Sequence, residues 1–498
     1  MRGMLRRLLL ISFSLLIPAV ASAAPCERLT SLTGGATTVT LAQTVAAGAF
    51  KPPTGRAGGP AGARAFESLP AFCRVAATLK PTPRSDIRME VWLPASGWNG
   101  KLQVVGNGAF AGTISYPAMA TALAAGYATA STDTGHTGPS SSTFANDDVL
   151  IDFAYRAVHE TTAAAKKVID ALYGAAPKFS YFNGCSTGGR QALTEAQRYP
   201  DDFNGIVAGA PASFGSKQVF GQIWIYQATA SAEAALTPDK QRALHQAVLE
   251  ACDANDGVKD GVLENPLTCR FDPQVLACKG DDSASCLTAP QVEAARRIYA
   301  GASNPRTGEF IFPGFERGSE AAWSPMPVGY AVDLLKYTVF NDPNWDPKAL
   351  NFDSDLARAQ KTKNYMLMDA NDANLDHFTR RGGKLLMYQG WAEQGIPPRN
   401  VVTYYDRVQK ETHDAKNSVR LFMVPGMGHC GGGDGTSTFD MAVALDQWVS
   451  GAHAPASIPA SRVRNGVTDR TRPLCPWPQV ATYSGTGSTD DAKNFVCK

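Results

Sequence analysis

The sequence predicts an α/β fold in which one long insertion interrupts a mainly parallel sheet covered by helices. Residues 88–213 alternate apolar, strand-like segments with helical ones, a pattern typical of a parallel sheet with helices on both faces. The alternation stops at residue 214 and returns near residue 382. The chain has 498 residues, of which 44% are hydrophobic and 18% charged. It is therefore too long for one compact core of usual size, and its composition is that of a globular protein.

The elements of the first core part, residues 24–213, follow from local pattern. IRMEVWLP alternates apolar and polar residues as a half-buried strand does. The alanine-rich segment before Gly174 has the composition of a helix that ends at a glycine. The expected elements are, in order, strands 87–94, 101–110 and 126–135, helix 153–174, strand 178–184, helix 190–200 and strand 203–212.

Residues 214–370 are expected to form a lid insertion. They are rich in Pro, Asn, Asp and Trp and contain four cysteines. Aromatic residues that could line a substrate pocket or fill the core of this lid are Trp224, Tyr226, Trp323 and Tyr330. The second core part, residues 371–498, is expected to contain a strand at 382–390, a helix at 399–412, a strand and loop at 418–430 and a closing helix at 437–451.

The first 23 residues have the features of a secretory signal peptide. Three arginines precede a short apolar run, and the small residues ASA at 21–23 form a cleavage site. We therefore expect the protein to be secreted or periplasmic. Without this leader, 44 basic residues balance 45 acidic ones. A chain so close to neutral, without a basic run, is not expected to bind nucleic acid or a membrane surface.

All ten cysteines lie after the leader, and an even number in an exported chain favours disulfides over free thiols or metal sites. Local pairs that would each close a short loop are Cys252–Cys269, Cys278–Cys286 and Cys475–Cys497. The other cysteines expected in disulfides are Cys26, Cys73, Cys185 and Cys430.

Ser186 is the predicted nucleophile. It is the serine of a G-x-S-x-G motif, Gly184 to Gly188, with an apolar strand before it and a helix after it. That setting is typical of the nucleophile elbow of α/β-hydrolases, whereas the same motif elsewhere is an ordinary glycine turn. The amide of Thr187, at the start of the helix, could face a developing oxyanion.

His429 is the predicted general base among seven histidines. In this fold the chain order is serine, acid, histidine, and the histidine lies on the last strand-to-helix loop. His429 follows a late strand in VPGMGHCGGG. The acid then belongs on the loop after the preceding strand, where Glu393 is the predicted residue. Asp406 and Asp414 are rivals on the following helix.

The sequence resembles the tannase and feruloyl esterase family of secreted α/β-hydrolases, which includes bacterial hydrolases of mono(2-hydroxyethyl) terephthalate. The resemblance covers essentially the whole mature chain. Its strongest carriers are Cys-Ser at 185–186 and His-Cys at 429–430, supported by the blocks GNGAFAG, STDTGH and NGIVAGAPA. The resemblance implies a disulfide between Cys185 and Cys430, and an oxyanion-hole amide from Gly108 or Ala109.

This chain departs from the family at two positions. The family usually has aspartate at the acid position, where this chain has Glu393. Glutamate can serve as the triad acid in α/β-hydrolases, but its extra methylene must be accommodated. Gln389 stands where a relative of the terephthalate type has histidine, which argues against that substrate.

The acidic loop CDANDGVKDGVLENPLTC, residues 252–269, is a predicted calcium site in the lid. Carboxylates at close spacing suit Ca²⁺, although the loop is not an EF-hand and could also be a polar turn. The resemblance implies a structural calcium. The ligands it implies are the carboxylates of Asp253, Asp256 and Asp260 and the carbonyls of Val258 and Val262.

These residues predict an exported serine carboxylesterase that cleaves small aromatic-acid esters with Ser186, His429 and Glu393 and without an organic cofactor. Feruloyl, galloyl and terephthaloyl esters remain open as substrates. The alternatives are a mono(2-hydroxyethyl) terephthalate hydrolase and a calcium-dependent binding protein on a degenerate hydrolase scaffold. Among other enzymes, the rivals are a peptidase and a lipase. A lipase needs an exposed apolar lid, and no strongly amphipathic helix stands out in this sequence.

Overall fold

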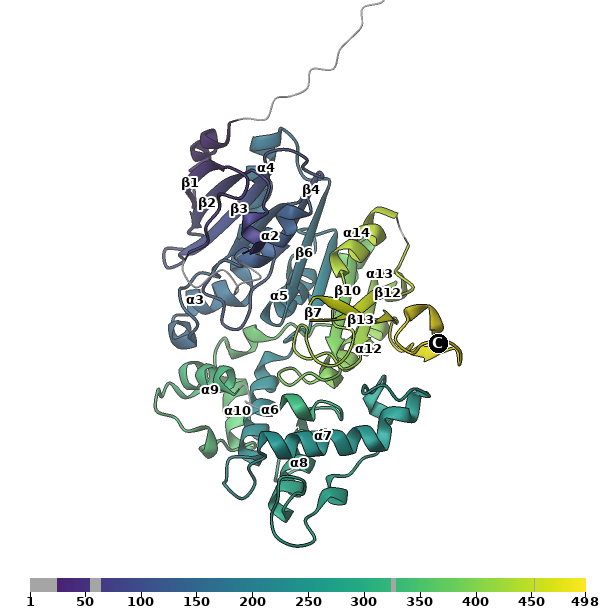
Figure 1. Ribbon diagram of the computed structural model, residues 1–498. Coiled ribbons are helices and arrows are strands. Elements are labelled where there is room, and N and C mark those ends of the chain that lie inside the picture. The colour runs from purple at the N-terminus through teal and green to yellow at the C-terminus, as the bar shows by residue number, and fades with distance from the viewer. Residues whose placement is uncertain (1–24, 54–63, 324–327, 452) are drawn as a thin grey trace, which may run out of the picture.

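The computed structural model describes residues 25–53, 64–323, 328–451 and 453–498 (Figure 1). The predicted signal peptide, residues 1–23, lies outside the described residues. Within the described part, no helix combines the length and the apolar character that crossing a bilayer requires.

A nine-stranded sheet forms the centre of the fold, in the order β1-β2-β3-β5-β4-β6-β7-β10-β11. The pairs from β1 to β5 are antiparallel, and the pairs from β5 to β11 are parallel. The strands are β1 (Thr37–Val45), β2 (Phe72–Leu79), β3 (Ile87–Pro94), β4 (Lys101–Val105), β5 (Ala128–Thr132), β6 (Phe179–Cys185), β7 (Gly205–Gly209), β10 (Lys384–Gly390) and β11 (Val419–Val424).

Helices cover both faces of the sheet. Successive side chains of each strand point to opposite faces, so each strand contributes to the core on both sides. On β10, Leu385 belongs to the core under α4 (Ala157–Tyr173), α5 (Thr187–Arg198) and α12 (Pro398–Glu411). Its neighbour Leu386 belongs to the core under α2 (Tyr116–Ala124) and α14 (Met441–Gly451). Strands buried on both sides are apolar throughout, as β7 is. The α/β-hydrolase fold class is therefore confirmed.

The chain between β7 and β10 leaves the sheet and forms a separate group of helices, which Figure 1 shows below the sheet. Two apolar clusters hold this group together, and one of them includes Phe110, Phe144 and Phe153 from the first part of the chain. The elements are α6 (Gly215–Ala228), α7 (Pro238–Cys252), α8 (Ala289–Ala300), β8 (Ala302–Ser303), β9 (Phe310–Phe312), α9 (Gly329–Leu335) and α10 (Ser354–Lys361). The next helix, α11 (Asp376–Arg380), packs through Phe378 into the core that α5 and α12 cover.

The remaining elements are short. They are α3 (Asp147–Ile151), α13 (Ala415–Ser418), the hairpin β12 (Ile458–Arg464) with β13 (Val467–Leu474), and the pair β14 (Ala481–Tyr483) with β15 (Phe495–Cys497). The strands not predicted from sequence are β1, β2, β8, β9 and these last four.

The ten cysteines form five disulfides. Three are the local pairs that the sequence predicts, Cys252–Cys269, Cys278–Cys286 and Cys475–Cys497. The others join Cys26 to Cys73 and Cys185 to Cys430. None of the ten cysteines is left as a free thiol.

Candidate active site

Ser186 lies at a sharp turn between a strand and a helix. β6 ends at Cys185, α5 begins at Thr187, and Ser186 between them has φ +66° and ψ −120°. A positive φ is strained for a residue that carries a Cβ. Strain at a strand-to-helix turn is the backbone feature of a nucleophile elbow, which exposes the serine above the sheet.

The turn also requires glycine at its closest backbone contacts. A Cβ on Gly184 would lie 2.6 Å from the carbonyl carbon of Gly188, and one on Gly106 would lie 2.7 Å from the Cα of Gly188. No side chain fits at either position. The loop after β4 is thus held directly against the turn that carries Ser186.

His429 lies between Ser186 and Glu393. Its Nε2 is 2.9 Å from Ser186 Oγ, and its Nδ1 is 2.7 Å from Glu393 Oε2. Burial alone would lower the pKa of His429, but the hydrogen bond and the negative charge of Glu393 outweigh burial and raise it above its ordinary value. The three side chains expected from sequence therefore meet, with β6, β10 and β11 each leading into one of their loops.

Glu393 is fully buried, and both oxygens of its carboxylate accept hydrogen bonds. Oε1 accepts hydrogen bonds from the amides of Gly395 at 2.6 Å and Ile396 at 3.2 Å. Oε2 accepts from His429 and, at 3.4 Å, from Gln389 Nε2. The loop after β10 is thus built around a glutamate. The rival acids Asp406 and Asp414 are both exposed.

The Cys185–Cys430 disulfide joins the two loops that carry Ser186 and His429. The two Cα atoms are 6.0 Å apart, and the cysteines are 245 residues apart in sequence. Each is the chain neighbour of one of these side chains. The bond fixes the spacing of the two loops at the point where the Ser186–His429 contact forms.

Gly108, Ala109 and Thr187 lie beside Ser186, on the rim of the same cleft. Thr187 Oγ1 donates a 2.6 Å hydrogen bond to the carbonyl of Ala109, which links the loop after β4 to the start of α5. Ala109 has φ +46°, a conformation that turns the backbone of this loop sharply. The hydrogen bond thereby fixes the backbone of this loop beside Ser186.

The cleft above Ser186 has a volume of about 630 Å³. Its walls come from both core parts and from α6 and α9. The lining residues are Asn107, Gly108, Ala109, Cys185, Ser186, Thr187, Ala212, Gln218, Gln222, Tyr330, Gln394, Gly395, Ile396, His429 and Cys430.

Sequence analysis identified only part of this lining. Among the four aromatic residues considered for a pocket, Tyr330 lines the cleft, whereas Trp323 is fully buried in the core of the inserted helices. The glutamines Gln218, Gln222 and Gln394 were missed. Two of them are four residues apart on α6, a spacing that places them on one helix face, but nothing local indicates what that face meets.

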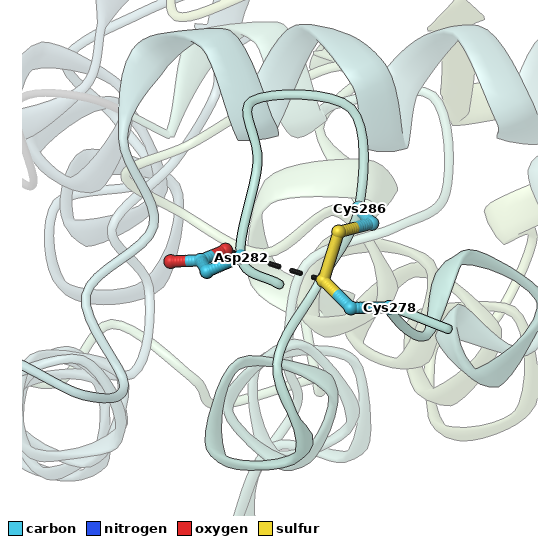
Figure 2. Close-up of side chains that lie close together, drawn as sticks. All are labelled: Cys278, Asp282 and Cys286. Carbon is cyan, nitrogen blue, oxygen red and sulfur yellow. Dashed lines mark hydrogen bonds between the residues drawn. A yellow bond between two sulfur atoms is a disulfide. The ribbon is translucent and has the colours of Figure 1, made fainter. Parts of the chain in front are cut away.

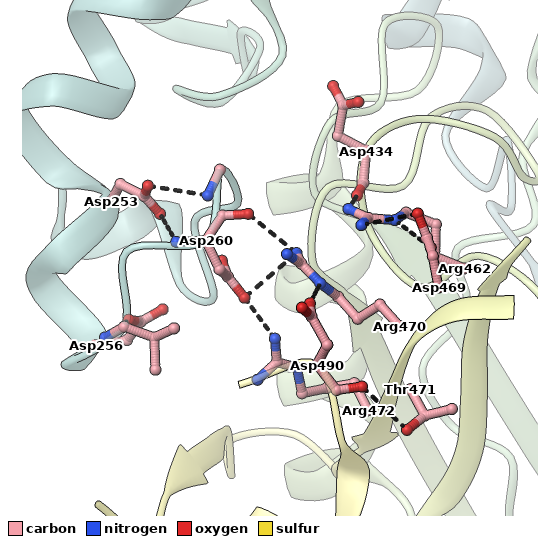
Figure 3. Close-up of polar contacts among 12 residues, drawn as sticks. Asp253, Asp256, Asp260, Asp434, Arg462, Asp469, Arg470, Thr471, Arg472 and Asp490 are labelled. Atoms are coloured by element: carbon pink, nitrogen blue, oxygen red, sulfur yellow. Dashed lines mark hydrogen bonds and ion pairs between the residues drawn. The ribbon is translucent and has the colours of Figure 1, made fainter. Parts of the chain in front are cut away.

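The acidic loop does not gather its carboxylates around one point (Figure 3). Asp253 accepts hydrogen bonds from the amides of Gly261 at 2.9 Å and Asp260 at 3.3 Å. The carboxylate of Asp260 instead forms ion pairs with Arg470, at 3.3 Å, and with Arg472. The oxygen donors suit a hard cation, but in this arrangement two arginines neutralise Asp260.

Asp256 is half-buried, and its Oδ1 accepts a 2.9 Å hydrogen bond from the amide of Val258. Burial raises its pKa above the ordinary value, and the nearby carboxylates of Asp260 and Asp253 add to the rise. Among the described residues, Cys278, Asp282 and Cys286 are the one group of three potential ligands that lie within 4.8 Å of one another (Figure 2). Those two sulfurs form a disulfide, so they cannot bind a metal as thiolates.

Comparison with known proteins shows which family the chain belongs to. A family profile described as tannase and feruloyl esterase matches residues 73–498. An uncharacterized esterase of Xanthomonas campestris is 38% identical over all of this chain and 95% of its own length. "Probable feruloyl esterase B-2" of Aspergillus terreus is 33% identical over 85% of this chain and 86% of its own length.

Solved structures show the same fold. Feruloyl esterase B from Aspergillus oryzae superposes with a TM-score of 0.86 at 30% identity, covering 95% of this chain and 99% of that one. Tannin acyl hydrolase from Aspergillus niger gives 0.73 at 21% identity, covering 96% and 93%. The chain belongs to the tannase and feruloyl esterase family, and it is a carboxylic ester hydrolase.

Proposed function

We propose that the protein is an exported serine esterase that cleaves aromatic-acid esters through an acyl-enzyme, with Ser186 as nucleophile. The observation that carries this proposal is the continuous chain of contacts from Ser186 Oγ through His429 to Glu393, at 2.9 and 2.7 Å. Such a chain activates a serine that would otherwise be a weak nucleophile.

In the proposed reaction, Ser186 Oγ attacks the ester carbonyl while His429 Nε2 takes the serine proton. Glu393 stabilises the imidazolium that forms and keeps Nδ1 protonated. The amides of Thr187 and Gly108, or Ala109 in place of Gly108, stabilise the oxyanion of the tetrahedral intermediate. His429 then protonates the leaving alcohol. Water releases the acyl group by the same steps in the second half-reaction.

Several observations support an aromatic-acid ester as the substrate of an exported enzyme. Two of the relatives above are named feruloyl esterases, and the lining of the cleft includes the ring of Tyr330 and the apolar side chain of Ile396. The five disulfides suit an oxidising compartment, in agreement with a signal peptide at 1–23. Residues 214–370 would act as the lid that closes the cleft.

A structural calcium ion in the lid is part of this proposal. The carboxylates of Asp253, Asp256 and Asp260 and the carbonyls of Val258 and Val262 would hold it, after Asp260 turns from the arginines. The carboxylate of Asp256, whose pKa is raised mainly by burial, would gain a positively charged partner from such an ion. The calcium ion would fix the conformation of the loop. It would have no part in the reaction, because no proposed step at Ser186 involves a metal.

The test of the proposed function compares the parent protein with Ser186→Ala on methyl ferulate. The parent should hydrolyse the ester, and the variant should lose at least about a thousandfold in kcat. A variant that keeps the parent rate would contradict the proposal. A parent protein that binds methyl ferulate without hydrolysing it would favour the alternative of a calcium-dependent binding protein.

A further inference from the structure

Three glutamine side chains line the cleft with amide oxygens that have no hydrogen-bond partner among the described residues. They are Gln218, Gln222 and Gln394, called here the cleft amides. The oxygen of each is buried, and the Gln218 side chain as a whole is only 4% exposed. An unpaired buried polar group is destabilising. In a cleft, water or a bound ligand can pair it.

The backbone and one contact fix the positions of these amides. Gln218 and Gln222 are four residues apart on α6 and so lie on one helix face. Gln222 Nε2 donates a 3.1 Å hydrogen bond to the carbonyl of Gly395, which ties α6 to the loop of Glu393. The Gln218 side chain makes no hydrogen bond to a described residue. Among the described residues, its amide is therefore positioned by packing.

The rest of the cleft is uncharged and partly aromatic. Among the described residues that line it, none is lysine or arginine, and His429 is its one titratable base. Tyr330 stacks on Phe110, with ring centroids 4.2 Å apart and an angle of 10° between the rings. A flat aromatic group therefore has an apolar surface to rest on. A carboxylate has no cationic side chain to pair with, and unlike a hydroxyl it has no proton to donate to the unpaired amide oxygens.

We infer that the cleft amides recognise the neutral hydroxyl groups of an aromatic acyl group and disfavour an acyl group that ends in a carboxylate. A phenolic hydroxyl can donate to an amide oxygen and accept from an amide nitrogen, so it completes groups that the protein leaves unpaired. This inference rests on the proposed function, because it assigns the acyl side of the same esterase site. It favours hydroxylated cinnamic or benzoic esters over the terephthalate monoester.

The experiment measures kcat/KM for methyl ferulate, methyl cinnamate and mono(2-hydroxyethyl) terephthalate. The first two share the methanol leaving group, so their difference reports the acyl ring. The parent should prefer methyl ferulate to both of the others. Gln218→Leu should lower the ferulate-to-cinnamate ratio about 5- to 10-fold, because it removes one hydrogen-bonding group and adds apolar surface. Gln218→Arg should raise the terephthalate-to-ferulate ratio, because it supplies a cation.

The matched control is Gln246→Leu, which changes an exposed glutamine of α7 in the same group of helices and should leave both ratios as in the parent. If Gln218→Leu unfolds, Gln394→Leu tests the same ratio at a half-buried position. An unchanged ratio in a folded variant, or a parent that prefers the terephthalate monoester, would overturn this inference and leave the esterase intact. A parent that hydrolyses none of the three esters would instead overturn the proposed function.

Discussion

The length of the acid side chain is the most sensitive feature of the proposed triad. Glu393→Asp gives this chain the residue that the family usually has at the acid position, yet we predict a loss of activity. One methylene fewer withdraws the carboxylate by about 1.5 Å. The Nδ1–Oε2 contact of 2.7 Å would then exceed hydrogen-bond reach unless the loop moves. The bonds that Oε1 accepts from the amides of Gly395 and Ile396 would be stretched as well, so the shortened side chain loses support at both oxygens.

The expected loss follows from the bond that is removed. A hydrogen bond to a charged group contributes about 1.5–3 kcal/mol, and each 1.36 kcal/mol in the barrier is a factor of ten in rate. We therefore expect kcat of Glu393→Asp on methyl ferulate to fall about 10- to 100-fold, which agrees with the cost of a misplacement of about 1 Å. Initial rates at saturating ester measure it directly.

The matched control is Glu411→Asp, which shortens an exposed glutamate at the end of α12 and should keep the parent kcat. Thermal unfolding of both variants separates a lost contact from a lost fold. If folded Glu393→Asp has a kcat equal to or above that of the parent, the claim that this loop is built around a glutamate is wrong.

Three further predictions concern the disulfide, the pH profile and the lid. The double variant Cys185→Ala with Cys430→Ala should lose kcat at least tenfold while still folding, and an unchanged kcat in the folded variant would refute the positional role. Protonated imidazole accepts no proton, so kcat/KM should fall as the pH is lowered through the pKa of His429. Because that pKa is raised, the fall should be centred above the ordinary histidine value of about 6.5. Glu393→Gln should move that fall to lower pH, and an unmoved profile would contradict the assignment. Chelation with EDTA should lower the melting temperature by several degrees, and added Ca²⁺ should restore it. Asp256→Asn should reduce the rise in melting temperature that Ca²⁺ produces. A melting temperature that changes with neither EDTA nor Ca²⁺ would exclude the ion.

The elements that could be predicted from sequence are those whose burial leaves an apolar pattern. Strands β6 and β7 and the helix between them were predicted, because both faces of the parallel sheet are covered. β1 was missed because it is an edge strand with mostly exposed or half-exposed residues. The hairpin of β12 and β13 was missed for a related reason, since most of its first strand and the start of its second are not buried.

The site residues that could be predicted from sequence are likewise those with a local sequence pattern. Ser186 and His429 have local motifs and a fixed chain order, so sequence alone points to them. The role of Gln222 depends on a contact with Gly395, which is 173 residues away in sequence, and no local pattern encodes it. In the acidic loop, by contrast, a clear local pattern is modified by contacts from distant parts of the chain. Its spacing suggests a cation site, but the ion pairs of Asp260 with Arg470 and Arg472 come from the distant strand β13.

Covalent labelling of Ser186 tests the central claim most directly. The parent protein and Ser186→Ala would each be treated with a fluorophosphonate, and the intact mass and the modified peptide would be measured by mass spectrometry. We expect one adduct per parent chain, on Ser186, with loss of methyl ferulate hydrolysis in proportion to labelling. The variant should carry none. A parent protein that hydrolyses methyl ferulate without labelling, or that carries its adduct on another residue, would contradict the account.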